Sequence, residues 1–288
     1  MKDGAQAVAV KQSPTWRGAS PPPPRRLGPA DWGRVVRRGL PLGVTVFGGL
    51  GVLLVLRGVE RPVFGARRPV TPWIARGVCR AALWWLGMRF TVRGRPLRAP
   101  GAAVANHASW LDIFALNAAD DVVFVAKAEV AGWPGIGWLA RATGTLFIRR
   151  DRAEAAAQAR RFAARLAGGQ RLLFFPEGTS TDGQRVLPFK PTLFAAFFAP
   201  DMKDAAHVQA ITVKYAAPAG QDRRFYGWWG DMGFGPHLLQ VLAVPRQGAV
   251  EVIYHPPLRV ADFAGRKALA GHAEHQVRAG LTTGAPAP

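Results

Sequence analysis

The chain has 288 residues, enough for one large domain or two small ones, and its 49% apolar composition predicts a sizeable core. A formal charge of +20 predicts a polyanionic neighbour, either nucleic acid or an anionic membrane, unless it reflects only an arginine-rich codon bias. Ten tryptophans favour the membrane, because indole prefers the headgroup region. A single cysteine, Cys79, excludes an intrachain disulfide framework and a multi-cysteine zinc site, and it fits a reducing cytoplasm.

The first 88 residues predict a basic tail followed by a membrane anchor. Residues 1–38 are rich in proline and arginine and predict a solvated, mostly disordered tail without the layout of a signal peptide. Residues 39–56 carry no charge, and as a helix they would be about 27 Å long, just enough to span a bilayer core. Arginine clusters on both sides of this stretch argue against a single span.

A second apolar stretch, residues 73–86, contains Arg76 and Arg80, which favours an interfacial amphipathic helix over a second span. We therefore expect residues 39–88 to form a helical hairpin that dips into one leaflet and keeps both ends cytoplasmic. Two buried core helices are the alternative.

From Phe90 onward, short apolar runs alternate with helical patterns. This alternation predicts an α/β domain over residues 89–265, with a central, mostly parallel or mixed sheet flanked by helices. Residues 266–288 are expected to form a tail with a short helical segment. The expected strands are 102–105, 122–126, 145–148, 172–175, 209–213 and 250–254, and the expected helices are 109–118, 133–142 and 151–167.

Three stretches carry residues suited to chemistry. His107 precedes Asp112 by five residues, so an imidazole able to take a proton near neutral pH could be oriented by a carboxylate. Residues 144–150 end a predicted strand in Arg149 and Arg150, and guanidinium groups pair with phosphates and carboxylates. Residues 174–180 run from a strand into a Pro-Glu-Gly turn, where Gly178 permits close approach of a ligand.

Together these stretches resemble the motifs of the lysophospholipid acyltransferase family, the bacterial relatives of 1-acyl-glycerol-3-phosphate acyltransferase. The resemblance covers roughly residues 75–255: 106–112 is similar to the first motif, 144–150 to the second and 175–179 to the third. Residues 208–211 lie where the fourth motif belongs, with Ala210 in place of its proline.

The resemblance implies transfer of a fatty acyl group from an acyl carrier protein or coenzyme A thioester to a free hydroxyl. His107 is then the general base and Asp112 its orienting partner, with no acyl-enzyme. A nucleophilic Ser109 is the alternative, and backbone N–H groups near Gly178 or at the helix after Asp112 are candidate oxyanion donors. The implied substrate-binding residues are Asn106, Arg150, Glu177, Gly178, Thr179 and Ser180.

The acceptor is indicated by a departure from the family pattern. Members that use a phosphomonoester acceptor usually have arginine where this chain has Ser180, and Asp182 adds a negative charge nearby. Residues 177–183 and 225–231 resemble the bacterial lyso-ornithine lipid acyltransferases. We therefore expect O-acylation of lyso-ornithine lipid; 1-acyl-glycerol-3-phosphate is the alternative acceptor, served by Arg149, Arg150 and Lys190, and one enzyme could use both.

The remaining expectations concern partners. No cofactor or metal is expected, because the six histidines are scattered and His272 with His275 has no further ligands. Membrane lipids and acyl carrier protein are the expected partners, at the inner membrane with the site facing the cytoplasm. The alternative without catalysis is a basic protein that binds nucleic acid or tethers membranes. The sequence has no nucleic-acid-binding signature that would support it beside the charge.

Overall fold

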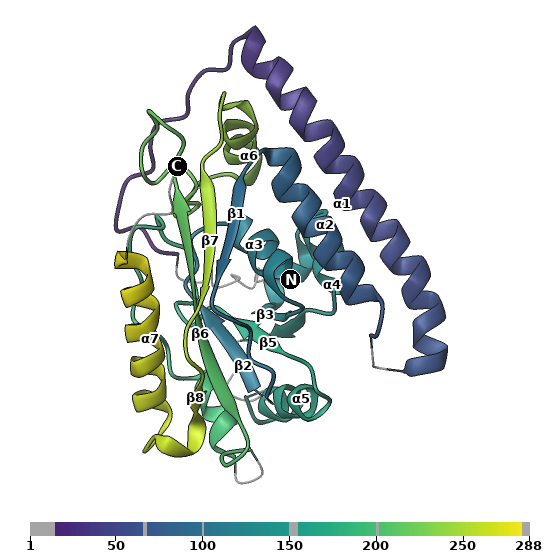
Figure 1. Ribbon diagram of the computed structural model, residues 1–288, viewed down its shortest axis with the longest axis vertical. Coiled ribbons are helices and arrows are strands. Elements are labelled where there is room, and N and C mark those ends of the chain that lie inside the picture. The colour runs from purple at the N-terminus through teal and green to yellow at the C-terminus, as the bar shows by residue number, and fades with distance from the viewer. Residues whose placement is uncertain (1–14, 66–67, 100, 150–154, 200–201, 284–288) are drawn as a thin grey trace, which may run out of the picture.

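The computed structural model describes residues 15–65, 68–99, 101–149, 155–199 and 202–283. Two antiparallel helices, α1 (Pro29–Phe64) and α2 (Thr71–Leu86), open the chain and pack against each other along one side of the molecule (Figure 1). α1 begins ten residues before the predicted apolar stretch, because Pro29 fits the first turn of a helix and the Asp31 carboxylate accepts the Gly28 N–H at 2.9 Å.

Residues 15–28 are extended and lie against the rest of the protein, so the solvated tail predicted for residues 1–38 does not describe this segment or the start of α1. The first 14 residues of that prediction lie outside the described residues. α1 is long and apolar enough to cross a membrane, and among the described helices it is the one that meets this criterion.

A mixed eight-stranded sheet forms the centre of the described chain, in agreement with the predicted fold class. Its strand order is β1-β7-β6-β2-β5-β3-β4, with β8 beside β6; β6 runs antiparallel to β7 and β8, and the other pairs are parallel. The strands are β1 (Arg89–Arg93), β2 (Gly101–Ala105), β3 (Val123–Lys127), β4 (Leu146–Ile148), β5 (Leu172–Phe174), β6 (His207–Ala216), β7 (Ala249–Tyr254) and β8 (Leu258–Arg259).

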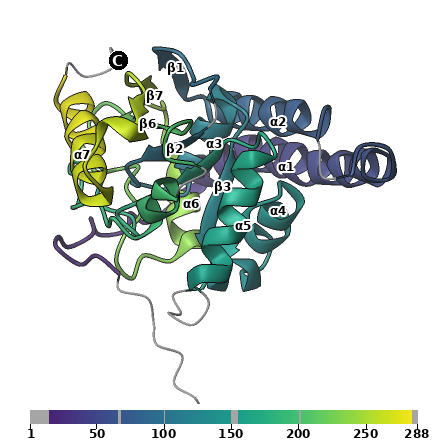
Figure 2. The ribbon, with the colours of Figure 1, turned by 90° about the horizontal axis from the view of Figure 1, so that it is seen from below.

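Neighbouring side chains on each strand alternate between two hydrophobic clusters, one on each face of the sheet. On β2, Ala105 belongs to the cluster beneath α1, α2 and α3 (Leu111–Ala119), whereas Val104 belongs to the cluster beneath α5 (Ala155–Ala167) and α7 (Arg266–Thr282). Seen from below, α7 therefore lies on the opposite side of the sheet from α1 and α2 (Figure 2).

The remaining helices complete the two layers. α4 (Ile136–Ala142) and α6 (Phe234–Ala243) both contact α1, and α6 covers the end of the sheet that carries β1 and β7 (Figure 1). α7 has 17 residues and packs against β6 through Ala273 and Val277, so most of the predicted C-terminal tail is an integral part of the core. Residues 284–288 lie outside the described residues.

Candidate active site

The structure brings His107 and Asp112 together at the carboxyl end of β2. The chain leaves the sheet after Ala105 and enters α3 at Leu111, so the loop between them returns His107 to the first turn of the helix. His107 Nδ1 lies 2.7 Å from Asp112 Oδ2. The Asp112 side chain is fully buried, whereas 22% of the His107 side chain remains exposed.

Backbone contacts hold the Asp112 carboxylate in place. Its Oδ2 also accepts the N–H groups of Ala108 at 2.8 Å and Ser109 at 3.0 Å, as an acidic side chain does at a helix N-terminus. Because this carboxylate accepts, Nδ1 of His107 carries the proton and donates, and Nε2 keeps its lone pair. The imidazole therefore presents a basic nitrogen, and its ring is stacked on Phe175 with centroids 4.1 Å apart.

Tyr215 on β6 is a further partner of Asp112 that the sequence motifs did not reveal. Its hydroxyl donates to Asp112 Oδ1 at 2.7 Å. Burial, and then the neighbouring Asp112 carboxylate, raise the pKa of Tyr215, so the phenol keeps its proton and remains a donor. The sequence could have indicated the position of Tyr215 through the alternation of side chains along a strand. Tyr215 lies on the same face of β6 as Ile211 and Val213.

Glu177 ties the third motif to the first. Its Oε1 accepts the His107 N–H at 2.7 Å and its Oε2 accepts the Leu187 N–H at 2.7 Å. Burial raises the pKa of Glu177 to about 8, although both N–H donors favour the ionised form. With only 1% of the residue exposed, Glu177 positions the His107 backbone and does not face a ligand.

Asn106 also has a positioning role where substrate binding was predicted. Its Nδ2 donates to Val213 O at 2.9 Å and its Oδ1 accepts Val213 N–H at 2.8 Å. The residue is 1% exposed, so its amide joins the end of β2 to β6 immediately before His107. Both polar atoms are thereby committed to the backbone.

Ser109 is not placed as a nucleophile. It is fully buried, and its hydroxyl has no hydrogen-bond partner among the described residues, so His107 does not activate it. One of the suggested oxyanion donors is also engaged, because Gly178 N–H donates to Phe175 O at 3.0 Å. Gly178 has φ +71°, which explains why glycine stands at this turn.

The second motif lies at the end of β4 and contacts the α1–α2 connection. Gly144 has φ +83°, and a Cβ there would meet the Arg68 guanidinium at 2.8 Å, so glycine gives Arg68 room to donate to Ala142 O. Arg149 is exposed. Arg150, a predicted substrate-binding residue, lies outside the described residues.

The extended N-terminal segment covers the third motif. Trp16 N–H donates to Thr179 Oγ1 at 3.2 Å, and Trp229 Nε1 donates to Ala19 O at 2.8 Å. Ser180 is half-buried in the same loop. We call residues 15–20 the strap, because they join this loop to the polypeptide that leads into α1.

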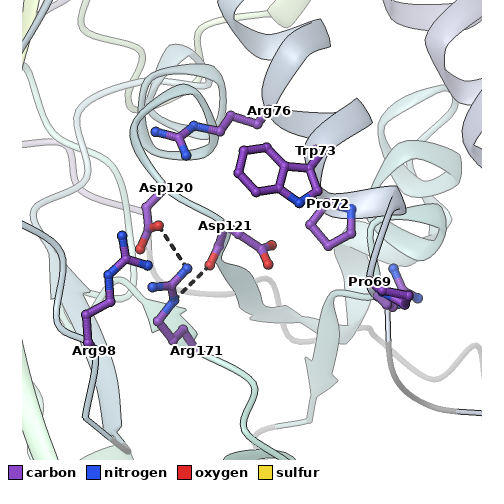
Figure 3. A pocket seen from close by; sticks show the side chains of 9 residues that line it. Pro69, Pro72, Trp73, Arg76, Arg98, Asp120, Asp121 and Arg171 are labelled. Carbon is purple, nitrogen blue, oxygen red and sulfur yellow. Dashed lines mark hydrogen bonds and ion pairs between the residues drawn. The ribbon is translucent and has the colours of Figure 1, made fainter. Parts of the chain in front are cut away.

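A cavity of about 160 Å³ lies away from His107, at the amino ends of β3 and β5 (Figure 3). Arg171 Nη2 donates to Asp120 Oδ1 at 2.8 Å there, and Arg76 from α2 approaches the same cluster. The cavity therefore belongs to an ion-pair network beneath α2. Within the described ranges, no group of three or more His, Cys, Asp or Glu side chains is placed to hold a metal ion.

Known proteins resemble the chain in sequence and in fold. A family model described as acyltransferase matches residues 89–213. The chain is 54% identical to a lyso-ornithine lipid O-acyltransferase of Rhodobacter capsulatus, over 93% of this chain and 97% of that protein. It is 31% identical to a 1-acyl-sn-glycerol-3-phosphate acyltransferase of Neisseria meningitidis, over 78% of this chain and 85% of that protein.

The fold has a counterpart of known structure. The crystal structure of the 1-acyl-sn-glycerophosphate acyltransferase from Thermotoga maritima superposes with a TM-score of 0.57 and 22% identity, over 86% of this chain and 95% of that one. This likeness extends into the first 88 residues, because 86% of this chain exceeds the part that follows residue 88.

Proposed function

This chain belongs to the acyltransferase family, and from that membership we propose that it transfers a fatty acyl group from a thioester to the free hydroxyl of lyso-ornithine lipid. Its relatives are acyltransferases of lipid biosynthesis. The acceptor is supported by 54% identity over nearly the whole length of a lyso-ornithine lipid O-acyltransferase. Ser180 adds to this support, because a hydroxyl replaces the guanidinium that would hold a phosphomonoester.

The observation that carries the chemistry is the hydrogen bond of 2.7 Å between His107 Nδ1 and Asp112 Oδ2. With Nδ1 occupied, Nε2 takes the proton of the acceptor hydroxyl as its oxygen attacks the thioester carbonyl. The tetrahedral intermediate collapses, the carbon–sulfur bond breaks, and the imidazolium returns the proton to the leaving thiolate. Asp112 stabilises the imidazolium throughout, and no acyl-enzyme is needed.

A second acceptor, 1-acyl-glycerol-3-phosphate, is favoured by the relative in Neisseria meningitidis. Arg149 in the second motif and Lys190 in the segment after the third motif are both exposed, so cationic groups for a phosphate are present. We propose this acceptor as the alternative or additional substrate.

We propose acyl carrier protein or coenzyme A as the acyl donor, because acyl transfer to a hydroxyl requires an activated carbonyl. The enzyme is associated with the membrane through α1 and α2, and we place it at the inner membrane with His107 on the cytoplasmic side. A C-terminal epitope that antibodies reach only in inverted membrane vesicles would support this orientation, and access in intact spheroplasts would exclude it.

The acceptor is tested by giving the purified protein a carrier-protein thioester and each lysolipid in turn. We expect a higher kcat/KM for lyso-ornithine lipid than for 1-acyl-glycerol-3-phosphate. A strong preference for the phosphate acceptor would exclude the first proposal and support the second.

The catalytic pair is tested separately with His107→Ala and Asp112→Asn. Asparagine cannot accept from all four donors around Asp112, so the imidazole tautomer and its charge stabilisation are both lost. We expect kcat to fall by about 10³- to 10⁴-fold in each variant while membrane binding is unchanged. Normal turnover by His107→Ala would remove the general-base role.

A further inference from the structure

A buried carboxylate holds the guanidinium of Arg185 in the loop that follows the third motif. Asp182 is fully buried, and its two oxygens accept Arg185 Nε at 3.2 Å and Nη2 at 3.0 Å. Gln184 N–H donates to the same carboxylate at 3.1 Å. This bidentate pair fixes the plane of the guanidinium, because both oxygens and two nitrogens are engaged side by side.

The outer edge of this guanidinium faces away from Asp182. The Arg185 side chain is 48% exposed, and its Nη1 has no hydrogen-bond partner among the described residues. The Trp16 ring lies over the guanidinium, 5.0 Å from its central carbon to the ring centroid. One face of Arg185 is therefore covered by the strap, while the edge that carries Nη1 stays accessible.

The same loop is fastened to the catalytic histidine. Thr181 N–H donates to His107 O at 2.9 Å, and Thr181 Oγ1 donates to Arg185 O at 3.3 Å. One residue on, a Cβ at Gly183 would lie 3.3 Å from the Ala108 side chain. Arg185 is thus held in the loop that flanks the reacting group, on the side covered by Trp16.

We propose that Arg185 binds the carboxylate of the acceptor headgroup and so selects an amino-acid lipid over a phosphomonoester. The inference rests on the proposed lyso-ornithine lipid acceptor and adds the side chain that recognises its headgroup. An ornithine headgroup carries one carboxylate and one ammonium, and a carboxylate suits a single outward guanidinium edge. Asp182 offsets much of the charge of Arg185, so the site can pair with a monovalent carboxylate but lacks the surplus positive charge that would neutralise a phosphate dianion.

Trp16 contributes to the same site. Its ring lies 6.2 Å from that of Trp229, measured between centroids, so two indoles flank the loop at the strap. Indole covers the guanidinium from water, which strengthens its interaction with a carboxylate. The strap therefore acts as one wall of the headgroup site.

The test compares two acceptors and matched variants of the full-length enzyme in detergent–lipid micelles. The acceptors are lyso-ornithine lipid and its carboxamide, in which the carboxylate is replaced by a neutral amide. The variants are Arg185→Gln and, as a control, Arg93→Gln on β1. Arg93 is similarly exposed, at 53%, and pairs with Glu251 at the far edge of the sheet.

We expect Arg185→Gln to raise KM for lyso-ornithine lipid by about 10- to 100-fold, the loss typical of a hydrogen bond to a charged group, with little change in kcat. The wild-type enzyme should show a comparable rise in KM for the carboxamide, and Arg185→Gln should add nothing further to it. Arg93→Gln should behave as the wild type with both acceptors.

Equal losses by Arg185→Gln with both acceptors would overturn the proposal, because a role confined to holding the loop predicts that result. Equal use of the two acceptors by the wild type would also overturn it, while leaving the proposed function intact. A wild-type enzyme that acylates other lysolipids but not lyso-ornithine lipid would instead overturn the proposed function.

A second variant keeps the inference testable if Arg185→Gln does not fold. Trp16→Leu removes the indole above Arg185 but leaves the ion pair with Asp182. We expect a KM several-fold higher for lyso-ornithine lipid and unchanged for the carboxamide. The same change in KM for both acceptors would exclude a headgroup role for the strap.

Discussion

Tyr215 shows how far the proposed catalytic pair, His107 and Asp112, depends on residues distant in sequence. Its hydroxyl donates to Asp112 Oδ1 at 2.7 Å, whereas His107 pairs with Oδ2. Together with the two backbone N–H donors on Oδ2, this bond fixes both carboxylate oxygens. The imidazole orientation is therefore set from β2, α3 and β6 at once.

We expect Tyr215→Phe to lower kcat by about tenfold, since one hydrogen bond to a charged group is lost and the ring volume is kept. The loss should be far smaller than that of Asp112→Asn, because the backbone donors remain. Single-turnover rates at saturating substrate measure the effect. A rate equal to that of the wild type would mean that the backbone donors alone position Asp112.

His237 on α6 gives the protein a defined acid sensitivity. It accepts Trp110 Nε1–H at 2.9 Å on Nδ1, which requires the neutral ring, and burial lowers its pKa to about 4. In the unfolded chain the ordinary pKa is about 6.5. The stabilising contribution is thus complete above pH 6.5 and is lost as the pH falls towards 4, because only the unfolded state gains the proton.

Between pH 7.5 and 5, we expect His237 to account for about 2 kcal/mol of lost stability, the free energy of 1.5 pH units below the ordinary pKa. In His237→Gln, whose amide oxygen can still accept Trp110 Nε1–H, this part of the pH dependence should disappear. Urea unfolding in detergent at the two pH values measures the free energy of unfolding of each protein. Parallel pH dependence of the two would contradict the assignment.

At the scale of single residues, the motifs predicted the pair but not the purpose of every motif residue. The spacing predicted that His107 lies beside Asp112, because a loop followed by the first turn of a helix brings residues five apart in the sequence close together. Asn106 and Glu177 were predicted to bind substrate, and the structure commits their polar atoms to Val213, His107 and Leu187. Sequence shows which side chains are polar, but only the fold shows which of them are already satisfied.

At the scale of single elements, α3 is held by hydrogen bonds at both of its ends. At its N-terminal end, the Asp112 carboxylate accepts N–H groups from the preceding loop, and its C-terminal carbonyls accept hydrogen bonds from arginines of α2. Arg76 Nη2 donates to Ala119 O at 2.8 Å, and Arg80 Nε donates to Ala118 O at 3.0 Å. Cations at a helix C-terminus also interact favourably with the helix dipole.

We expect the double variant Arg76→Gln, Arg80→Gln to lose about 2 to 4 kcal/mol of stability, from two charge-assisted hydrogen bonds in a half-buried setting. Thermal unfolding in detergent measures the loss. Arg61→Gln in the last turn of α1 is the matched control, and it should change stability by less than about 0.5 kcal/mol. Equal effects of the two changes would contradict the capping role.

Helices and strands with a clear pattern of apolar residues were predictable from the sequence, and those without such a pattern were not. β2, β5 and β6 were found because short apolar runs mark buried strands. β1 was missed because its side chains are mostly exposed at the edge of the sheet. α6 was missed because Gly235 and Pro236 interrupt its first turn, where the helix tolerates them.

At the scale of the whole molecule, an apolar surface extends over the outer sides of α1 and α2 and continues onto α4. It is rich in branched aliphatic residues and tryptophan, and it lies on the side of the protein away from α7 (Figure 2). Its exposed members include Leu40, Val44, Phe47, Val55, Val59, Val63, Trp73, Trp84 and Trp138. A soluble protein rarely leaves such a large area uncovered.

We expect the protein to stay in the membrane fraction through a wash in about 1 M salt, where charges interact over only about 3 Å. Val55→Lys with Val59→Lys, two changes on this surface, should weaken retention despite raising the positive charge. Fractionation followed by immunoblotting measures both. Release of the wild type by salt would show that its +20 charge alone holds it.

The packing of α1 and α2 also bears on how such enzymes can be recombined. Leu42, Val46, Leu83 and Leu86 share one hydrophobic cluster with Ile211 and Val250 of the sheet. A chimera joined at residue 88, with helices from one relative and catalytic residues from another, would therefore cut through a common core and separate Arg76 and Arg80 from the carbonyls they bind. We therefore expect exchange of acceptor specificity between relatives to succeed through the strap and the loop of residues 179–185, and to fail when the helices are exchanged as a block.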